Sequence, residues 1–172
     1  MINYHLSHTM KILFVGINPS LGTYRRRIPF SNNKMFWYLL NAAGLINEQR
    51  EDLRNDKKLR KMYDTKFGPM YQLGITNLVD RPADRIAELK AGEEIRGRKR
   101  IYSIIKRYKP KIVCFVGKAT YEKFIGRSVK TYGWKPTIGS SKIFLMHSPL
   151  HGLASVRVAE LKKIKQRVEK KQ

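Results

Sequence analysis

Four short apolar runs constrain the fold of this chain more than any other feature. They are rich in β-branched and aromatic residues, do not alternate with polar residues, and span 11–17, 74–79, 111–116 and 142–146. An antiparallel strand with one solvated face alternates between apolar and polar positions, whereas a strand that is apolar throughout is typical of a parallel sheet covered on both faces. We therefore expect four buried, parallel strands.

Segments with helical periodicity separate these runs. Apolar residues recur every three to four positions within 34–43, 95–105 and 121–125, and a last stripe runs through about 155–171. Alternating strands and helices build a parallel sheet between two helix layers. The sequence thus predicts an α/β fold, a three-layer sandwich with a central four-stranded parallel sheet. No linker or internal repeat divides the chain, so a single domain is expected over residues 1–172.

Charge is the largest anomaly in the composition. The chain has 36 Lys and Arg residues against 13 Asp and Glu residues, which gives a formal net charge of +23. Such a field attracts polyanions, of which DNA, RNA and an anionic membrane surface are the usual ones. A lysine-rich surface also accompanies heat adaptation, so the charge alone leaves the partner open.

Several classes of protein are disfavoured. No apolar run approaches the roughly 18 residues that span a bilayer, and the first ten residues lack the pattern of a secretory signal, so we expect a cytoplasmic protein, associated with the nucleoid and with no membrane. The single cysteine, Cys114, excludes an internal disulfide. The four histidines show no ligand spacing with cysteines or carboxylates, so neither a metal nor a cofactor is expected.

Unusual residues follow each of the four apolar runs. They occupy residues 16–20, 77–82, 117–118 and 147–152. Ligands of open parallel sheets bind beyond the carboxyl ends of the strands, so these loops are expected to converge on one site. Each loop alone also has a structural explanation as a turn, helix start or cap. Gly117-Lys118 lacks the upstream glycine of a P-loop, which argues against a nucleoside triphosphatase.

The same loops carry a family resemblance. Gly-Ile-Asn-Pro at 16–19, with Pro29-Phe30, Phe36-Trp37 and Ala43-Gly44, resembles the first motif region of the mismatch-specific uracil and thymine DNA glycosylases, a branch of the uracil-DNA glycosylase superfamily. The similarity continues through Gly-Ile-Thr-Asn-Leu-Val-Asp-Arg-Pro at 74–82 and covers about residues 10–165. Shorter matches lie at 97–98, 108–110, 117–118, 121–122 and 139–140.

The resemblance implies an activity and a substrate. The expected protein is a monofunctional DNA glycosylase, a monomer that flips uracil, with thymine as a further candidate, out of mismatches with guanine in double-stranded DNA. It hydrolyses the N-glycosidic bond and leaves an abasic site for base excision repair. Excision of another deaminated base, such as hypoxanthine, and an inactive DNA-binding module of the same fold remain alternatives. Lyase activity is disfavoured, although Lys118 lies close enough to be considered for a Schiff base.

The resemblance also assigns residues to the base pocket. Asn18 matches the catalytic asparagine, whose amide orients water but does not ionise to act as a base. Phe30 matches the aromatic residue that stacks on the flipped base, and the backbone amide of Ile17 is expected to donate to a base carbonyl. Asn77 stands where the family contacts the base edge. Related bacterial enzymes carry lysine there and animal thymine enzymes asparagine, so the base preference stays open.

The last motif departs from the mismatch-specific branch. That branch has Asn-Pro-Ser or Met-Pro-Ser, whereas this chain has His147-Ser148-Pro149. His147 resembles the histidine that begins this motif in other uracil-DNA glycosylases, where it hydrogen-bonds the uracil carbonyl. It is therefore a second candidate catalytic residue, with a capping or exposed histidine as the alternative.

The loop after His147 is expected to enter the minor groove of DNA. Leu150, Gly152 and Leu153 are expected to contact DNA. Leu150 or Leu153 would fill the gap left by the flipped nucleotide, and Arg157 would contact phosphate or the orphaned base. Because the loop is longer than in the family, the sequence does not decide which leucine inserts.

Other residues near the motifs are candidates for DNA contact. Arg25 and Arg26 lie in a segment expected to be a loop between Asn18 and Phe30, and Lys118 follows the third strand. Tyr24 is a candidate to exclude thymine through its methyl group, which would narrow the enzyme to uracil.

Overall fold

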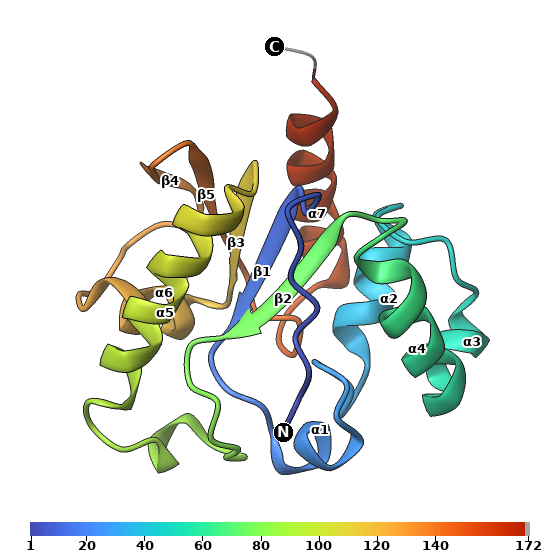
Figure 1. Ribbon diagram of the computed structural model, residues 1–172, viewed down its shortest axis with the longest axis horizontal. Helices are drawn as coiled ribbons and strands as arrows, with labels where there is room; N and C mark the ends of the chain where they lie inside the picture. Colours follow the sequence, from blue (N-terminus) through green and yellow to red (C-terminus); the bar gives the residue numbers. More distant parts are fainter. Residues whose placement is uncertain (171–172) are drawn as a thin grey trace.

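The four apolar runs form the centre of the fold (Figure 1), a computed structural model that describes residues 1–170. They become β1 (Ile12–Gly16), β2 (Leu73–Asn77), β3 (Ile112–Val116) and β5 (Ser141–Met146). Within the described residues the sheet has the order β2-β1-β3-β5-β4, and the first four strands of that order are mutually parallel. The predicted α/β fold is confirmed, with one strand more than expected.

The additional strand is β4 (Gly133–Ile138), which pairs antiparallel with β5 at the edge of the sheet. Its burial alternates along the strand, unlike the continuous burial of β1, β2 and β3. Pro136 has no backbone N–H to donate, which an edge strand tolerates. Gly139 adopts a positive φ of 56° in the tight turn between β4 and β5. The strand lies at the edge of the sheet and contains a proline and exposed residues, so it lacks the continuous apolar run that identifies the others.

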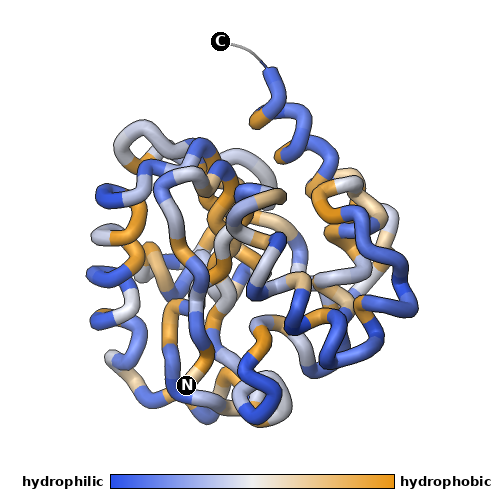
Figure 2. Tube along the Cα trace, turned by 45° about the vertical axis from the view of Figure 1, so that its right-hand side comes forward, coloured by the Kyte–Doolittle hydropathy of each residue, from blue (hydrophilic) through white to orange (hydrophobic). Residues whose placement is uncertain are grey.

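Two helix layers cover the sheet (Figure 1). One face packs against α2 (Met35–Ala42), α4 (Asp56–Met62) and α7 (Ala154–Glu169), and the other against α5 (Glu93–Tyr108) and α6 (Lys118–Ile125). Successive strand residues alternate between the two cores, since Ile12 and Phe14 join the first and Leu13 and Val15 the second. Figure 2 shows hydrophobic residues gathered toward the strands and hydrophilic ones along the outer turns of the helices.

The predicted helices are present as α2, α5, α6 and α7, with two qualifications. Ile95 was expected in the apolar stripe of the second helix, but it lies in the first turn of α5 and is 52% exposed. The predicted end of the last helix, Lys171, lies outside the described residues, and α7 ends at Glu169. Within residues 1–170, no helix is long and apolar enough to cross a membrane.

The segment that contains Arg25 and Arg26 is a helix and not the expected loop. Helix α1 (Leu21–Arg26) begins where the Ser20 side chain accepts a hydrogen bond from the Thr23 N–H at 3.1 Å, and it ends at the left-handed Arg27. The sequence signal was weak because the helix is short and carries no apolar stripe. Further elements that sequence patterns did not reveal are α3 (Arg50–Arg54), α4, a π-helix (Tyr63–Phe67) and a 3₁₀-helix (Ile86–Glu88).

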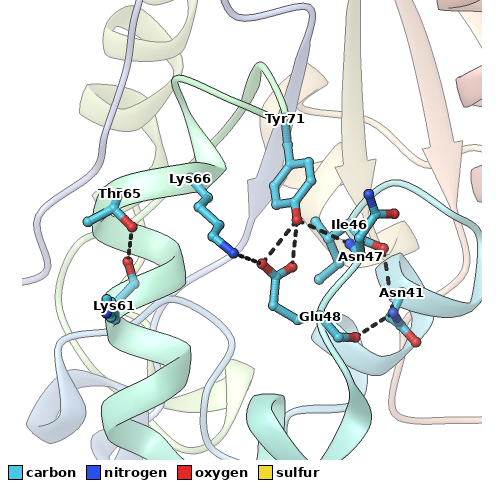
Figure 3. Close-up of polar contacts among 8 residues, drawn as sticks. All are labelled: Asn41, Ile46, Asn47, Glu48, Lys61, Thr65, Lys66 and Tyr71. Carbon is cyan, nitrogen blue, oxygen red and sulfur yellow. Dashed lines mark hydrogen bonds and ion pairs between the residues drawn. The ribbon is translucent and has the colours of Figure 1, made fainter.

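Glu48 links α2, the π-helix and the segment before β2 through its side chain and its backbone carbonyl (Figure 3). The Tyr71 hydroxyl donates to Glu48, with oxygen distances of 3.0 and 2.9 Å, and the Lys66 ammonium lies 3.3 Å from the same carboxylate. The Asn41 side chain donates to the Glu48 carbonyl at 2.7 Å. Tyr71 precedes β2 by two residues, so this cluster lies at the amino-terminal edge of the sheet.

Candidate active site

A cavity of about 800 Å³ opens at the carboxyl-terminal edge of the sheet. Residues from the loops after β1, β2, β3 and β5 line it together with residues from α1 and the segment after it. Of the residues assigned from sequence, the lining includes Ile17, Asn18, Arg25, Phe30, Asn77, Lys118 and Leu150. This is the position at which open parallel sheets bind ligands.

The side chain of Asn18 is fixed by two backbone carbonyls. Its Nδ2 donates to the Pro19 carbonyl at 3.0 Å and to the Ala83 carbonyl at 2.8 Å. Two acceptors on one side determine which end of the amide is nitrogen, so Oδ1 points the other way. No donor among the described residues occupies Oδ1, and the atom is not sealed from solvent. Asn18 therefore presents a preoriented acceptor that can hold a water molecule.

Phe30 lies against Phe36 in a stacked arrangement, with ring centroids 4.3 Å apart and an interplanar angle of 25°. Its backbone is left-handed at a φ of 52°, a conformation that costs a bulky residue on the order of 1 kcal/mol. The surrounding structure maintains this strain, and the ring is held at the wall of the cavity. One face of a planar ligand can thus be covered by an aromatic side chain.

Gly16, the last residue of β1, makes room for this arrangement. It pairs with Asn77 across the sheet, and a Cβ atom at Gly16 would lie 2.4 Å from Asn77 Oδ1 and 2.8 Å from Phe30 Cζ. Any side chain at position 16 would displace both. Gly16 was part of the Gly-Ile-Asn-Pro motif but was not assigned a site role from sequence, because its function is to leave space.

Asn77 is held at both its backbone and its side chain. The residue is 4% exposed, its carbonyl accepts from the Arg100 guanidinium, and its Nδ2 donates to the Tyr4 hydroxyl at 2.8 Å. Oδ1 lies on the side of Gly16 and Phe30, and no described residue donates to it. Asn77 therefore also offers an acceptor at the cavity. Tyr4 was missed from sequence, since nothing in its surroundings marks it.

Ile17 is half-buried between these residues. Its carbonyl accepts from the Val79 N–H at 2.8 Å, and the Gly16 carbonyl accepts from the Leu78 N–H at the same distance. These bonds extend the β1–β2 pairing beyond the strands and fix the peptide on which the predicted donor to a base carbonyl lies. That contact itself stays a prediction.

His147 is turned toward α7. Its backbone N–H donates to Glu160 Oε2 at 2.8 Å, its Nδ1 bonds Glu160 Oε1, and its ring stacks on Tyr132 with centroids 3.5 Å apart. A carboxylate only accepts, so Nδ1 carries the proton and Nε2 of a neutral ring is an acceptor. Among the described residues, the cavity lining includes Ser148 but not His147. With the proton on Nδ1, Nε2 of a neutral ring does not donate to a base carbonyl, and donation from Nε2 would need an imidazolium.

Arg157 has a position that the sequence did not indicate. It is 6% exposed, and its guanidinium donates to the Ser148 carbonyl at 2.8 Å and to the Leu153 carbonyl at 2.9 Å. Gly152, with a φ of 82°, lies against the same guanidinium. In this conformation Arg157 braces the loop from within and does not face the outside. The expected contact with phosphate would require it to leave these carbonyls.

The two candidate wedge residues are both exposed. Leu150 is 58% exposed at the mouth of the cavity, and Leu153 is 71% exposed immediately before α7. The loop between them is held from inside by Arg157. A loop that is held in place by Arg157 and exposes two leucines is suited to insertion between bases.

The remaining basic candidates separate into two groups. Arg25 is exposed and Lys118, at the start of α6, is half-buried, and both line the cavity. Arg26 instead pairs with Asp56 at 3.3 Å, outside the lining, and Tyr24 also lies outside it. Tyr24 therefore has no contact with the cavity through which it could select a base in this conformation.

A family model for the uracil DNA glycosylase superfamily matches residues 4–168 of the chain. The protein belongs to the uracil-DNA glycosylase superfamily. Enzymes of this superfamily are hydrolases that remove deaminated bases from DNA in base excision repair. The general class of this protein is thus DNA glycosylase, and its substrate is DNA.

The superfamily assignment fits the chemistry of the cavity. Among residues 1–170, no three His, Cys, Asp or Glu side chains gather in a way that could hold a metal ion. Cys114 is fully buried in β3, and this burial raises the pKa of its thiol well above the usual range, so it does not serve as a nucleophile. The polar side chains at the cavity wall are amides, hydroxyls and cations, together with the Asp84 carboxylate and the His151 imidazole. The amides and cations can orient water and stabilise an anion.

Proposed function

We propose that this uracil-DNA glycosylase superfamily protein is a monofunctional enzyme of the mismatch-specific branch, which excises uracil, and thymine more slowly, from mismatches with guanine. The observation that carries the proposal is the side chain of Asn18. Its amide nitrogen is tied to two carbonyls, and its Oδ1 is open beside an aromatic wall. A fixed, non-ionisable acceptor of this kind orients a water molecule without removing its proton completely.

The reaction follows from these positions. The flipped base stacks on Phe30, and the C1′–N bond breaks with its electron pair moving onto the base. Water held by Asn18 Oδ1 forms a bond to C1′, and its proton passes to solvent or to the departing base. The Ile17 N–H stabilises the charge that develops on the base carbonyl. Because Asn18 is a weak base, the chemical step is slow.

Asn77 supports uracil and thymine as the preferred bases. Its Oδ1 is an acceptor on the cavity side, and both bases present a ring N–H on the edge that would meet it. Hypoxanthine also carries a ring N–H, so it is the first alternative substrate to test.

The test is single-turnover base release from duplexes that carry one U·G, U·A, T·G or hypoxanthine·T pair, followed by alkaline cleavage of the abasic product. The proposal predicts fastest cleavage of the U·G duplex and slower cleavage of the T·G duplex. Fastest release of hypoxanthine would redirect the assignment to that base. Tight binding without cleavage of any duplex would reject the enzyme in favour of a DNA-binding module.

A further inference from the structure

Two aromatic side chains are exposed at the edge strand β4, on the face of the sheet that packs against α7. Tyr132 precedes the strand and stacks on His147, and Trp134 lies within it and is 45% exposed. Trp134 meets Phe144 of the α7-side core at an angle of 82°, and such a perpendicular contact covers at most one face of its ring. Neither aromatic residue lines the cavity of the candidate active site. A planar ring is therefore open to a partner outside that cavity.

The chain around these aromatic residues is strongly cationic. No Asp or Glu occurs between Glu122 and Glu160, whereas the same stretch contains six Lys and Arg residues. The carboxylate of Glu160 is itself engaged by the backbone and the ring of His147. Lys163 and Arg167 follow Glu160 at three and seven positions, so they share its side of α7, and both are exposed. The surface thus combines aromatic rings with cations and attracts a polyanion.

The chemistry of this surface selects among possible partners. A second copy of the chain carries the same formal net charge of +23 and would be repelled. Pro136 has no N–H to donate, so the free edge of β4 is poorly suited to pairing with a strand of another protein. Unpaired bases stack on exposed aromatic rings, whereas the bases of a duplex already cover one another's faces. Single-stranded DNA fits these properties best.

We propose that Tyr132 and Trp134, together with the exposed cations of α7, form a second DNA-binding site that holds an unpaired strand. The site adjoins the cavity, because His147, on which Tyr132 stacks, is followed directly by Ser148 of the cavity lining. A base stacks on Trp134, and the phosphates lie against the cations. The protein thus retains DNA where its strands are open, whichever base the cavity excises.

Trp134 is its own reporter in the test of this site. Stacking on a base quenches tryptophan fluorescence, and the other tryptophan, Trp37, is fully buried. The probe is an oligothymidylate of roughly ten nucleotides, a length within the usual range of single-strand sites. It is compared with a phosphodiester chain of the same length without bases and with a fully paired duplex. The site predicts strong quenching by the oligothymidylate and little by the other two.

Affinity is measured separately, by the fluorescence anisotropy of labelled probes, in Trp134→Ala and Trp134→Leu. Leucine keeps an apolar contact with Phe144, so it removes the flat ring while preserving the packing of the strand. Both variants should bind oligothymidylate about tenfold more weakly, the effect of one lost stacking contact, and bind the base-free chain as wild type does.

Tyr102→Ala is the matched control. Tyr102 is 47% exposed on α5, on the other face of the sheet, and it rests on Phe124 as Trp134 rests on Phe144. It also lies on a helix rich in Lys and Arg. Its removal should change neither affinity, because it lies outside the proposed site.

Three results would overturn the assignment. They are the absence of quenching in wild type, equal quenching by the base-free chain or the duplex, and a loss of affinity in Tyr102→Ala as large as that in Trp134→Leu. Failure of the proposed function is distinguishable, because none of these probes contains a U·G pair. A protein that binds oligothymidylate through Trp134 but releases no base from U·G duplexes keeps this site without being a glycosylase.

Discussion

Polar side chains have opposite roles at the amino-terminal and carboxyl-terminal edges of the sheet, where the parallel strands begin and end. At the amino-terminal edge the Glu48 carboxylate is fully engaged by Tyr71 and Lys66. At the carboxyl-terminal edge, Asn18 and Asn77 have their amide nitrogens engaged by the protein and their oxygens left open at a cavity. A polar group whose hydrogen-bonding atoms are all paired within the protein holds neighbouring segments together. An asparagine whose nitrogen alone is paired instead presents its oxygen to a water molecule or a ligand.

The difference has an energetic basis. A buried acceptor without any partner costs about 1–3 kcal/mol, so an open acceptor persists only where water or a ligand reaches it. The cavity provides that access for the two asparagines, and no cavity of this kind is needed at Glu48, whose partners are protein groups. Asparagine oxygens that lack a protein donor, on side chains held by hydrogen bonds from their own amide nitrogens, therefore mark the carboxyl-terminal edge as the functional one.

Apart from the removal of Asn18 considered below, the largest expected effect comes from filling the space between Asn77 Oδ1 and the Phe30 ring. Gly16→Ala places a methyl group against Asn77 and Phe30, so base release should fall by roughly 100-fold and stability by about 1–3 kcal/mol. Single-turnover kinetics and thermal melting measure the two effects. Gly68→Ala is the control, since a Cβ there meets nothing within 4 Å and should leave release unchanged. Normal release by Gly16→Ala would mean that Asn77 and Phe30 need not hold these positions.

A smaller loss of activity is expected when the aromatic ring of Phe30 is replaced by an apolar side chain that still fills much of its space. Phe30→Leu keeps an apolar side chain but loses the ring that stacks on Phe36 and would cover the flipped base. We expect kcat/KM for a U·G duplex to fall about tenfold, within the range of one stacking interaction. Unchanged kcat/KM would show that the ring only packs against the protein.

Two arginines near the functional edge should differ in their salt dependence. Arg25→Ala removes an exposed cation at the cavity and should reduce the slope of log affinity against log salt by about one unit. Arg157→Ala removes a buried brace and should weaken the fold without changing that slope. Binding measured between low and moderate salt distinguishes them. A flatter slope in Arg157→Ala would place its guanidinium on DNA, as the sequence first suggested.

The smallest effect on activity is expected at the opposite edge. Glu48→Gln replaces a carboxylate that holds Tyr71 and Lys66 and should lower stability by about 1–2 kcal/mol. Base release measured well below the melting temperature should match wild type. A loss of release as large as that of Phe30→Leu would erase the distinction between the two edges.

Much of this arrangement was predictable from sequence. Continuous apolar runs identified the parallel strands, and the strand order places the loops of Asn18, Asn77 and Lys118 at one edge. The edge strand β4 escaped prediction because Pro136 and its exposed alternate residues interrupt the pattern. Helix α1 escaped because six residues carry too little periodicity.

The contacts that refine the site were not predictable in the same way. Tyr4 meets Asn77 through tertiary packing, and neither residue type nor spacing announces it. The role of His147 depends on Glu160 of α7, and that of Arg157, itself in α7, depends on the loop carbonyls of Ser148 and Leu153. Motifs place residues at an edge, whereas hydrogen-bond partners from distant elements decide which way each side chain faces.

The most direct test of this account is single-turnover uracil release from a U·G duplex by Asn18→Ala, with duplex affinity measured in parallel. Removal of the open acceptor should slow release by about 100-fold or more and leave affinity nearly unchanged, because Asn18 acts on the water and not on the DNA. Release at the wild-type rate, or an equal loss of rate and affinity, would contradict the claim that the open acceptor of Asn18 carries the chemistry.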